Sequence, residues 1–262
     1  MKKLILLFIL FISSCAFAQK HKGIVYYGFI NALQRGYQKG DDSNAYMVFN
    51  NEQSYYVTAK DSLERAERIN EQKIDIDEDG KGGAISLGLK VSPHGDQVVY
   101  HVRKNTMWSN LLYGSQVYVK EIAPRMNWKI EKETKKIGSF QCKKATTKFR
   151  GRSYTAWFTI DIAVPFGPWK LNGLPGLILE AYDTDKFVSW YFKSVEYPTK
   201  NKETVKYIST TKGAKFTDYE GFKLFQEEQQ NRAIEKNRIV GKQFPNVIFG
   251  DPKLPAMFIE FE

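Results

Sequence analysis

The sequence has few residues that could form covalent links or hold a metal ion. Its 262 residues include two cysteines and three histidines. Cys15 lies in an N-terminal segment that we expect to be removed, so the exported chain keeps only Cys142 and no internal disulfide is expected. The histidines lack metal-ligand spacing, whereas zinc needs about four converging ligands. Stability is therefore expected to come from a hydrophobic core, which a chain of this length can build.

Long hydrophobic runs are missing after the N-terminus, so no later segment is predicted to cross a membrane. At the N-terminus, two lysines precede an apolar stretch over residues 4–12, which is typical of a secretory signal. Cleavage after Ala18 fits the small residues there; in the alternative, Cys15 ends a lipobox-like sequence and is lipidated. We predict a signal peptide over residues 1–18 and an exported protein that is periplasmic or secreted, or an outer-membrane lipoprotein anchored through Cys15.

The charge balance is basic, with 39 lysines and arginines against 29 acidic residues. Such an excess can attract nucleic acids or anionic surfaces. Basic and acidic residues alternate along the chain, however, as in residues 129–133, which indicates a solvated surface. We therefore expect no nucleic-acid partner.

Aromatic residues are abundant, at 15% of the chain, and they favour β-structure. Strands are predicted at residues 23–30, 45–49, 54–58, 97–102, 115–122, 127–132, 138–150, 152–162, 177–183 and 186–197. Because short turns join antiparallel neighbours, we expect one mainly β domain over residues 19–262, built as a twisted antiparallel sheet or half-barrel meander. A short helix over residues 63–72 and a C-terminal helix over about 218–238 make it a β-rich α+β fold.

One acidic motif resembles the start of a calcium-binding loop. Asp75, Asp77 and Asp79, followed by Gly80, match the pattern D-x-D-x-D-G. The twelfth position of such a loop supplies a bidentate glutamate, and here it is Ser86. We interpret the segment as an acidic surface loop, with a weak calcium contact as the alternative and no other cofactor expected.

Familiar catalytic motifs are missing from the sequence. It contains neither the G-x-S-x-G turn of serine hydrolases nor a phosphate-binding glycine loop, because Gly167, Gly173 and Gly176 have the wrong spacing and precede a strand. These glycines are expected to form a corner that lets Trp169 fold back onto the sheet. Carboxylate pairs of glycoside hydrolases can lie far apart in sequence, so a secreted hydrolase with a dispersed site stays an alternative to a non-catalytic protein.

Aromatic side chains on adjoining predicted strands are the main candidates for a binding surface. Tyr154, Trp157 and Trp169 either pack in the core or line a hydrophobic groove on one face of a curved sheet. Such a groove would take an apolar or peptide-like ligand, or a partner protein of the cell envelope. A structural subunit of an outer-membrane assembly is a further alternative.

An ordered series of motifs runs through residues 126–183. It comprises Met126-Asn127-Trp128, Gly138-Ser139-Phe140-Gln141-Cys142, Gly167-Pro168-Trp169 and Asn172-Gly173-Leu174-Pro175-Gly176-Leu177-Ile178. This series resembles the GLPGLI family, also called the Porph_ging domain family, of exported Bacteroidota proteins. The resemblance implies a cell-envelope protein of unknown function without established catalytic residues. Within the motifs, Arg152 and Trp157 are candidate site residues.

Overall fold

The computed structural model describes residues 22–33, 41–58, 73–76, 83–86, 95–113, 115–208, 214–244, 246 and 249–261. Its strands are β1 (Gly23–Asn31), β2 (Asp41–Phe49), β3 (Gln53–Thr58), β4 (Lys73–Ile76), β5 (Gly83–Ser86), β6 (Gln97–His101), β7 (Thr106–Tyr113), β8 (Ser115–Ile122), β9 (Lys129–Ile137), β10 (Phe140–Phe149), β11 (Arg152–Thr159), β12 (Leu177–Asp183), β13 (Val188–Glu196) and β14 (Lys215–Thr217). The helices are α3 (Tyr219–Gln243) and α4 (Leu254–Met257).

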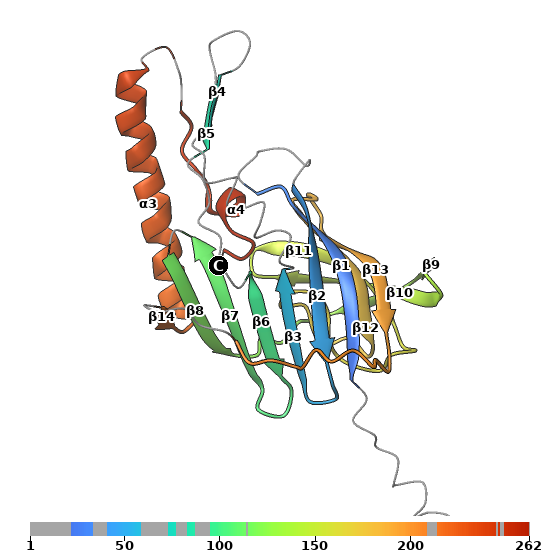
Figure 1. The fold of residues 1–262 in the computed structure, drawn as a ribbon. Coiled ribbons are helices and arrows are strands. Elements are labelled where there is room, and N and C mark those ends of the chain that lie inside the picture. Colours follow the sequence, from blue (N-terminus) through green and yellow to red (C-terminus); the bar gives the residue numbers. More distant parts are fainter. Residues whose placement is uncertain are drawn as a thin grey trace, which may run out of the picture.

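One large sheet organises the molecule (Figure 1). It has 12 strands in the order β14-β8-β7-β6-β3-β2-β1-β13-β12-β11-β10-β9, while β4 and β5 form a separate two-stranded sheet. Neighbouring strands of the large sheet are antiparallel, except that β14 runs parallel to β8. The predicted mainly β, antiparallel fold is therefore confirmed.

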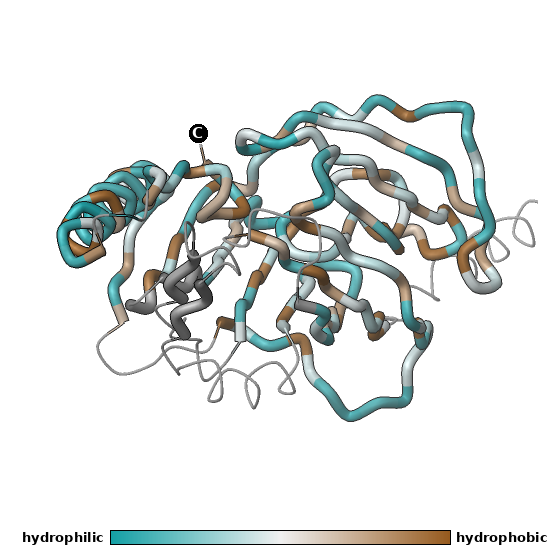
Figure 2. The backbone as a smooth tube through the Cα atoms, turned by 90° about the horizontal axis from the view of Figure 1, so that it is seen from above, coloured by the Kyte–Doolittle hydropathy of each residue, from teal (hydrophilic) through white to brown (hydrophobic). Residues whose placement is uncertain are grey.

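The sheet curls toward one of its faces, as the view from above shows (Figure 2). Trp190 on β13 donates a hydrogen bond of 2.9 Å to the hydroxyl of Tyr56 on β3. These strands are three places apart in the sheet, which corresponds to about 14 Å at the usual strand spacing. Inward curvature brings their side chains together, and we call the side on which they meet the concave face.

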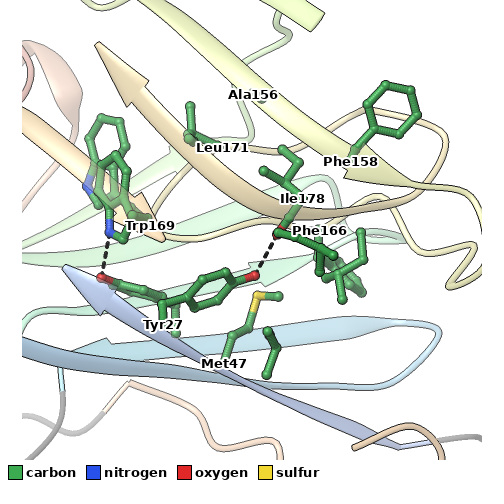
Figure 3. Close-up of a cluster of buried hydrophobic side chains, with 14 of the residues drawn as sticks. Tyr27, Met47, Ala156, Phe158, Phe166, Trp169, Leu171 and Ile178 are labelled. Atoms are coloured by element: carbon green, nitrogen blue, oxygen red, sulfur yellow. Dashed lines mark hydrogen bonds between the residues drawn. The ribbon is translucent and has the colours of Figure 1, made fainter. Parts of the chain in front are cut away.

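The loop over residues 160–176, between β11 and β12, fills the middle of the concave face (Figure 3). The ring of Phe166 lies 5.8 Å from that of Tyr100 on β6. Trp169 stacks on Trp190, with ring centroids 6.0 Å apart and planes 10° from parallel. Each large apolar side chain buried in this way contributes about 1.5–3 kcal/mol, so the loop is part of the hydrophobic core.

The C-terminal part of the chain covers the β8 end of the same face. Asp218 caps α3 by accepting a hydrogen bond of 2.9 Å from the Gly221 backbone. Phe222 on α3 packs with Val117 and Val119 of β8, beside Met257 and Phe258 of the C-terminal segment. A C-terminal helix was predicted over about 218–238, and α3 confirms it over Tyr219–Gln243. Of the helices the structure describes, none is both long and apolar enough to cross a membrane.

Several boundaries differ from the predictions for physical reasons. The strand expected at residues 127–132 lies at Lys129–Ile137, because the alternating Lys and Glu residues of this edge strand hide its length. Strands β4, β5, β7 and β14 were not predicted. The helix expected at residues 63–72 and the signal peptide over residues 1–18 lie outside the described residues.

Candidate functional site

A cluster of charged side chains joins four distant parts of the chain. Lys170 Nζ lies 2.7 Å from Glu121 Oε1 at the end of β8 and 2.6 Å from Glu260 Oε1 in the C-terminal segment. Arg150, in the turn between β10 and β11, forms an ion pair with Glu121, and its Nη1 lies 3.9 Å from Glu260 Oε2. We call Lys170, Glu121, Glu260 and Arg150 the Lys170 cluster.

The Lys170 cluster is almost sealed from solvent, and the Lys170 side chain is 0% exposed. Burial raises the pKa of Glu260, and the positive charge of Lys170 partly opposes this shift. Glu260 Oε2 and Arg150 Nη1 are buried without a hydrogen-bond partner among the described residues. Two bases balance two acids here, which makes removal of any one of them costly. The arrangement suits a structural role, which we call the latch: it holds the C-terminal segment and the loop over residues 160–176 against the end of β8.

The predicted site residue Arg152 also holds the C-terminal segment. Its Nη1 donates to Asp183 at 3.0 Å, its Nε donates to the carbonyl of Ile259 at 2.8 Å and its Nη2 donates to the carbonyl of Phe258 at 2.9 Å. Arg152 itself is buried. Its guanidinium group is therefore engaged within the chain, and a role in ligand binding stays a prediction.

The three aromatic residues predicted to bind a ligand are all buried. Tyr154 and Trp169 come together on the concave face, with ring centroids 6.2 Å apart. Trp157 instead lies against Lys135 of β9, whose Nζ is 4.6 Å from its ring centroid. The expected return of Trp169 onto the sheet is seen, and Trp169 itself takes a left-handed backbone with φ of 54°. Binding by these residues also stays a prediction.

The predicted calcium contact falls largely outside the described part of the chain. Asp75 belongs to β4, whereas Asp77 and Asp79 lie among residues that the structure does not describe. Within the described ranges, no group of three His, Cys, Asp or Glu side chains is placed to hold a metal ion. The calcium contact is untested and stays a prediction.

The outer face of the sheet carries a row of aromatic rings that was not predicted. In the registered pairs, Tyr26 faces Tyr46, Val99 faces both Tyr55 and Trp108, and Phe216 faces Tyr118. We call this set the aromatic row: Tyr26, Tyr46, Tyr55, Trp108, Tyr118 and Phe216. Only strand register shows that these rings share one face, because they come from six strands spread over most of the sequence.

The segment over residues 198–208 crosses the outer face of the sheet (Figure 1). The ammonium group of Lys22 donates to the carbonyls of Asn201 and Glu203. Gln53 Nε2 donates to the carbonyl of Lys206 at 2.9 Å. Val205 and Ile208 then pack against the cluster that contains Tyr55, Val57 and Val99. The β1–β6 part of the row is therefore covered by the chain itself.

At its other end, on β7, β8 and β14, the row reaches solvent through Phe216, which lies over the fully buried Tyr118. Phe216 is 60% exposed, and its ring centroid lies 5.5 Å from that of Tyr118 and 6.3 Å from that of Trp108. Lys120 Nζ lies 5.3 Å from the centroid of the Trp108 ring. We call Trp108, Tyr118, Lys120 and Phe216 the open end. Helix α3 packs on the opposite face of β8, so it leaves the open end uncovered.

A cavity of about 260 Å³ lies between α3 and the segment that returns beside it. Its lining residues are Ile234, Asn237, Arg238, Gly241, Phe249 and Asp251. Asn237 Nδ2 donates to the carbonyl of Gly250 at 2.8 Å and ties the two segments together. The cavity therefore lies between two surface segments, and its lining includes no residue of the concave face.

Comparison with family models gives a different match from the one that the motifs suggested. A family model described as "N-glycanase peptide, N-terminal domain" matches residues 99–220. No curated protein matches the chain. The resemblance to the GLPGLI family is therefore wrong: the matching model spans most of the quoted motifs and belongs to another family.

Solved structures of PNGF-II are among those similar to this chain. The structure in space group P21 has 14% sequence identity and a TM-score of 0.48, over 78% of this chain and 32% of that chain. The structure in space group C2 has 17% identity and a TM-score of 0.47, over 77% and 32% of the two chains. The chain thus spans about a third of the length of the PNGF-II chains.

Proposed function

We propose that the protein is an exported, non-catalytic module that binds the glycans of glycoproteins on the outer face of its sheet. The match to an N-glycanase N-terminal domain supports a role connected with glycans. N-linked glycans are surface features of secreted proteins, which agrees with the predicted export of this chain. The sequence favoured binding of an apolar or peptide-like ligand or an envelope partner on one sheet face; the proposal keeps binding to a sheet face and changes the ligand to a glycan.

The open end of the aromatic row is the observation that carries this proposal. Phe216 exposes most of its ring while resting on Tyr118 and against the edge of Trp108. Sugar rings present flat patches of C–H groups, which pack well against such aromatic surfaces while the sugar hydroxyls keep their contact with water. Neighbouring strands hold the supporting rings in register, so the surface is formed before a ligand arrives.

The filled concave face is a second observation that supports a non-catalytic role. The loop over residues 160–176 and the C-terminal segment occupy it, and the charged groups of the Lys170 cluster bind one another there. A general acid or base must reach within about 3 Å of the group it serves. Lys170 and Glu260 are too deeply buried for such contact with a glycan.

Isothermal titration of the protein with a neutral biantennary N-glycan tests the proposal. We expect saturable binding that weakens at least about fivefold in Phe216→Ala, since a stacked aromatic contact contributes about 1 kcal/mol beyond the area it buries. Leu224→Ala is the matched control, because Leu224 on α3 is similarly exposed, at 67%, and lies outside the aromatic row. Binding that is equally strong in both variants would place the glycan elsewhere, and no binding to neutral or acidic glycans would refute the function.

A further inference from the structure

We infer that the open end selects glycans that carry negative charge, such as N-glycans ending in acidic sugars. This inference rests on the proposed function and adds the chemical class of the ligand. It starts from the distribution of charge over the outer face and from the position of one lysine beside the exposed rings.

The outer-face positions of the described strands around the open end carry one lysine, Lys120, and no carboxylate. Strand pairing aligns Lys120 with Trp108, and His101 with Thr106, on this face. The acidic residue nearest in sequence, Glu121, alternates to the concave face, where it pairs with Lys170. Within the described parts of β6, β7, β8 and β14, the outer-face positions include no carboxylate. An anionic ligand would therefore meet no like charge from these strands.

Lys120 is the cation placed to meet an acidic group. It is exposed, and none of the ion pairs among the residues that the structure describes includes it. Lys206 shows the contrast: its Nζ lies 6.0 Å from the centroid of the Tyr55 ring, but Glu203 neutralises it at 3.2 Å. The covered part of the aromatic row thus has its cation paired, whereas the open end has one available.

The spacing suits a sugar that carries an acidic group. Lys120 Nζ and the centroid of Phe216 lie 5.3 Å and 6.3 Å from the centroid of the same Trp108 ring. A sugar ring that stacks on the exposed Phe216 ring lies beside the Trp108 ring over which Lys120 sits, so the flexible lysine side chain can reach a carboxylate substituent of that sugar. Stacking supplies most of the affinity, and the ion pair supplies the preference for charge.

Paired titrations test the inference. A sialylated biantennary N-glycan and the same glycan without its sialic acids are titrated into the protein at low salt and at 0.5 M salt. We expect the acidic glycan to bind about two- to fivefold more tightly at low salt, which is the range of an exposed ion pair. The preference should largely vanish at high salt, where the screening length falls to about 4 Å.

Two variants separate the charge from the stacking. Lys120→Gln should bring the affinities for the acidic and the neutral glycan to the same value, so that the ratio between them falls to about one. Lys148→Gln, at an exposed position on β10, is the control and should behave as the unmodified protein does. If the unmodified protein binds both glycans with equal affinity, and if Phe216→Ala loses that binding, the inference is overturned and the proposed function stands. Tighter binding of a single-stranded oligonucleotide at the same site would overturn the assignment to glycans.

Discussion

The ammonium group of Lys170 lies 2.6 Å from the carboxylate of Glu260, although 90 positions separate the two residues in the sequence. The contact joins the loop that fills the concave face to the C-terminal segment that covers its β8 end. Gln226 on α3 donates to the backbone carbonyl of Glu260 and adds the helix to the same junction. One buried ion pair therefore connects the pieces of chain that close this face.

Replacing Lys170 should destabilise the protein strongly. Lys170→Met leaves Glu260 and Glu121 buried with Arg150 as their remaining cation. Breaking a buried pair from one side costs about 3–5 kcal/mol. We expect this loss in the free energy of unfolding, measured with urea at pH 7. Lys148→Met, at an exposed position, should change stability by less than about 0.5 kcal/mol; equal effects of the two variants would contradict the latch.

Gly176 should not tolerate a side chain. A Cβ atom built there lies 2.0 Å from the backbone oxygen of Thr159 and 2.7 Å from its carbonyl carbon. Backbone atoms cannot move aside as a flexible side chain can, and such overpacking costs about 1–3 kcal/mol or more. Thermal unfolding should show Gly176→Ala melting well below the unmodified protein. Gly250→Ala is the control, since nothing lies within 4 Å of its Cβ position, and a normal melting temperature for Gly176→Ala would refute the close approach.

Asp96 should make stability depend on pH. Burial raises its pKa from 3.8 to about 6, so between these values the folded chain holds a proton that the unfolded chain releases. Stability from this group is therefore present below about pH 4 and is lost as pH rises through 6. This shift in the pKa of Asp96 corresponds to a loss of about 3 kcal/mol in the free energy of unfolding once the pH is above 6.

The difference in unfolding free energy between Asp96→Asn and the unmodified protein isolates this effect, because other groups contribute equally to both. We expect the variant to gain up to about 3 kcal/mol relative to the unmodified protein between pH 4 and pH 7.5. A difference that stays constant over this range would show that Asp96 ionises normally.

The thiol of Cys142 should be unreactive in the folded protein. It is buried on β10, and burial raises its pKa to about 11. Because the thiolate is the reactive form, we expect almost no reaction with a disulfide reagent at pH 8 and complete reaction in denaturant. A Cys15→Ser variant keeps the measurement specific to Cys142, and rapid labelling of its folded form would contradict this burial.

Local patterns predicted much of the fold. The apolar run of β12 and the alternating residues of β8 marked strands whose bounds agree with the structure. The aspartate at position 218 marked the start of α3. Short-range signals were sufficient in these places because strand and helix formation depend on nearby residues. Strand β14 has only three residues and pairs with a distant strand, so it left no comparable local pattern.

The candidate site shows the limit of such patterns. Trp169 and Tyr154 were recognised as aromatic residues near each other, but their burial depended on a loop folding onto the concave face. Phe216 lies in a short segment without a clear periodicity, and its neighbour Tyr118 comes from a strand almost a hundred positions earlier. A ring becomes part of a surface only when strand order brings its neighbours beside it.

The sequence by itself determined that the chain forms antiparallel strands and a C-terminal helix, because turn chemistry and hydrophobic periodicity act over a few residues. The tertiary structure alone decided which face of the sheet is filled and which is open. That choice depends on the curl of 12 strands and on where residues 160–176 and 198–208 pack. The Lys170 cluster and the open end of the aromatic row both arise from that packing, since charges and rings from distant strands meet only after the sheet has curled.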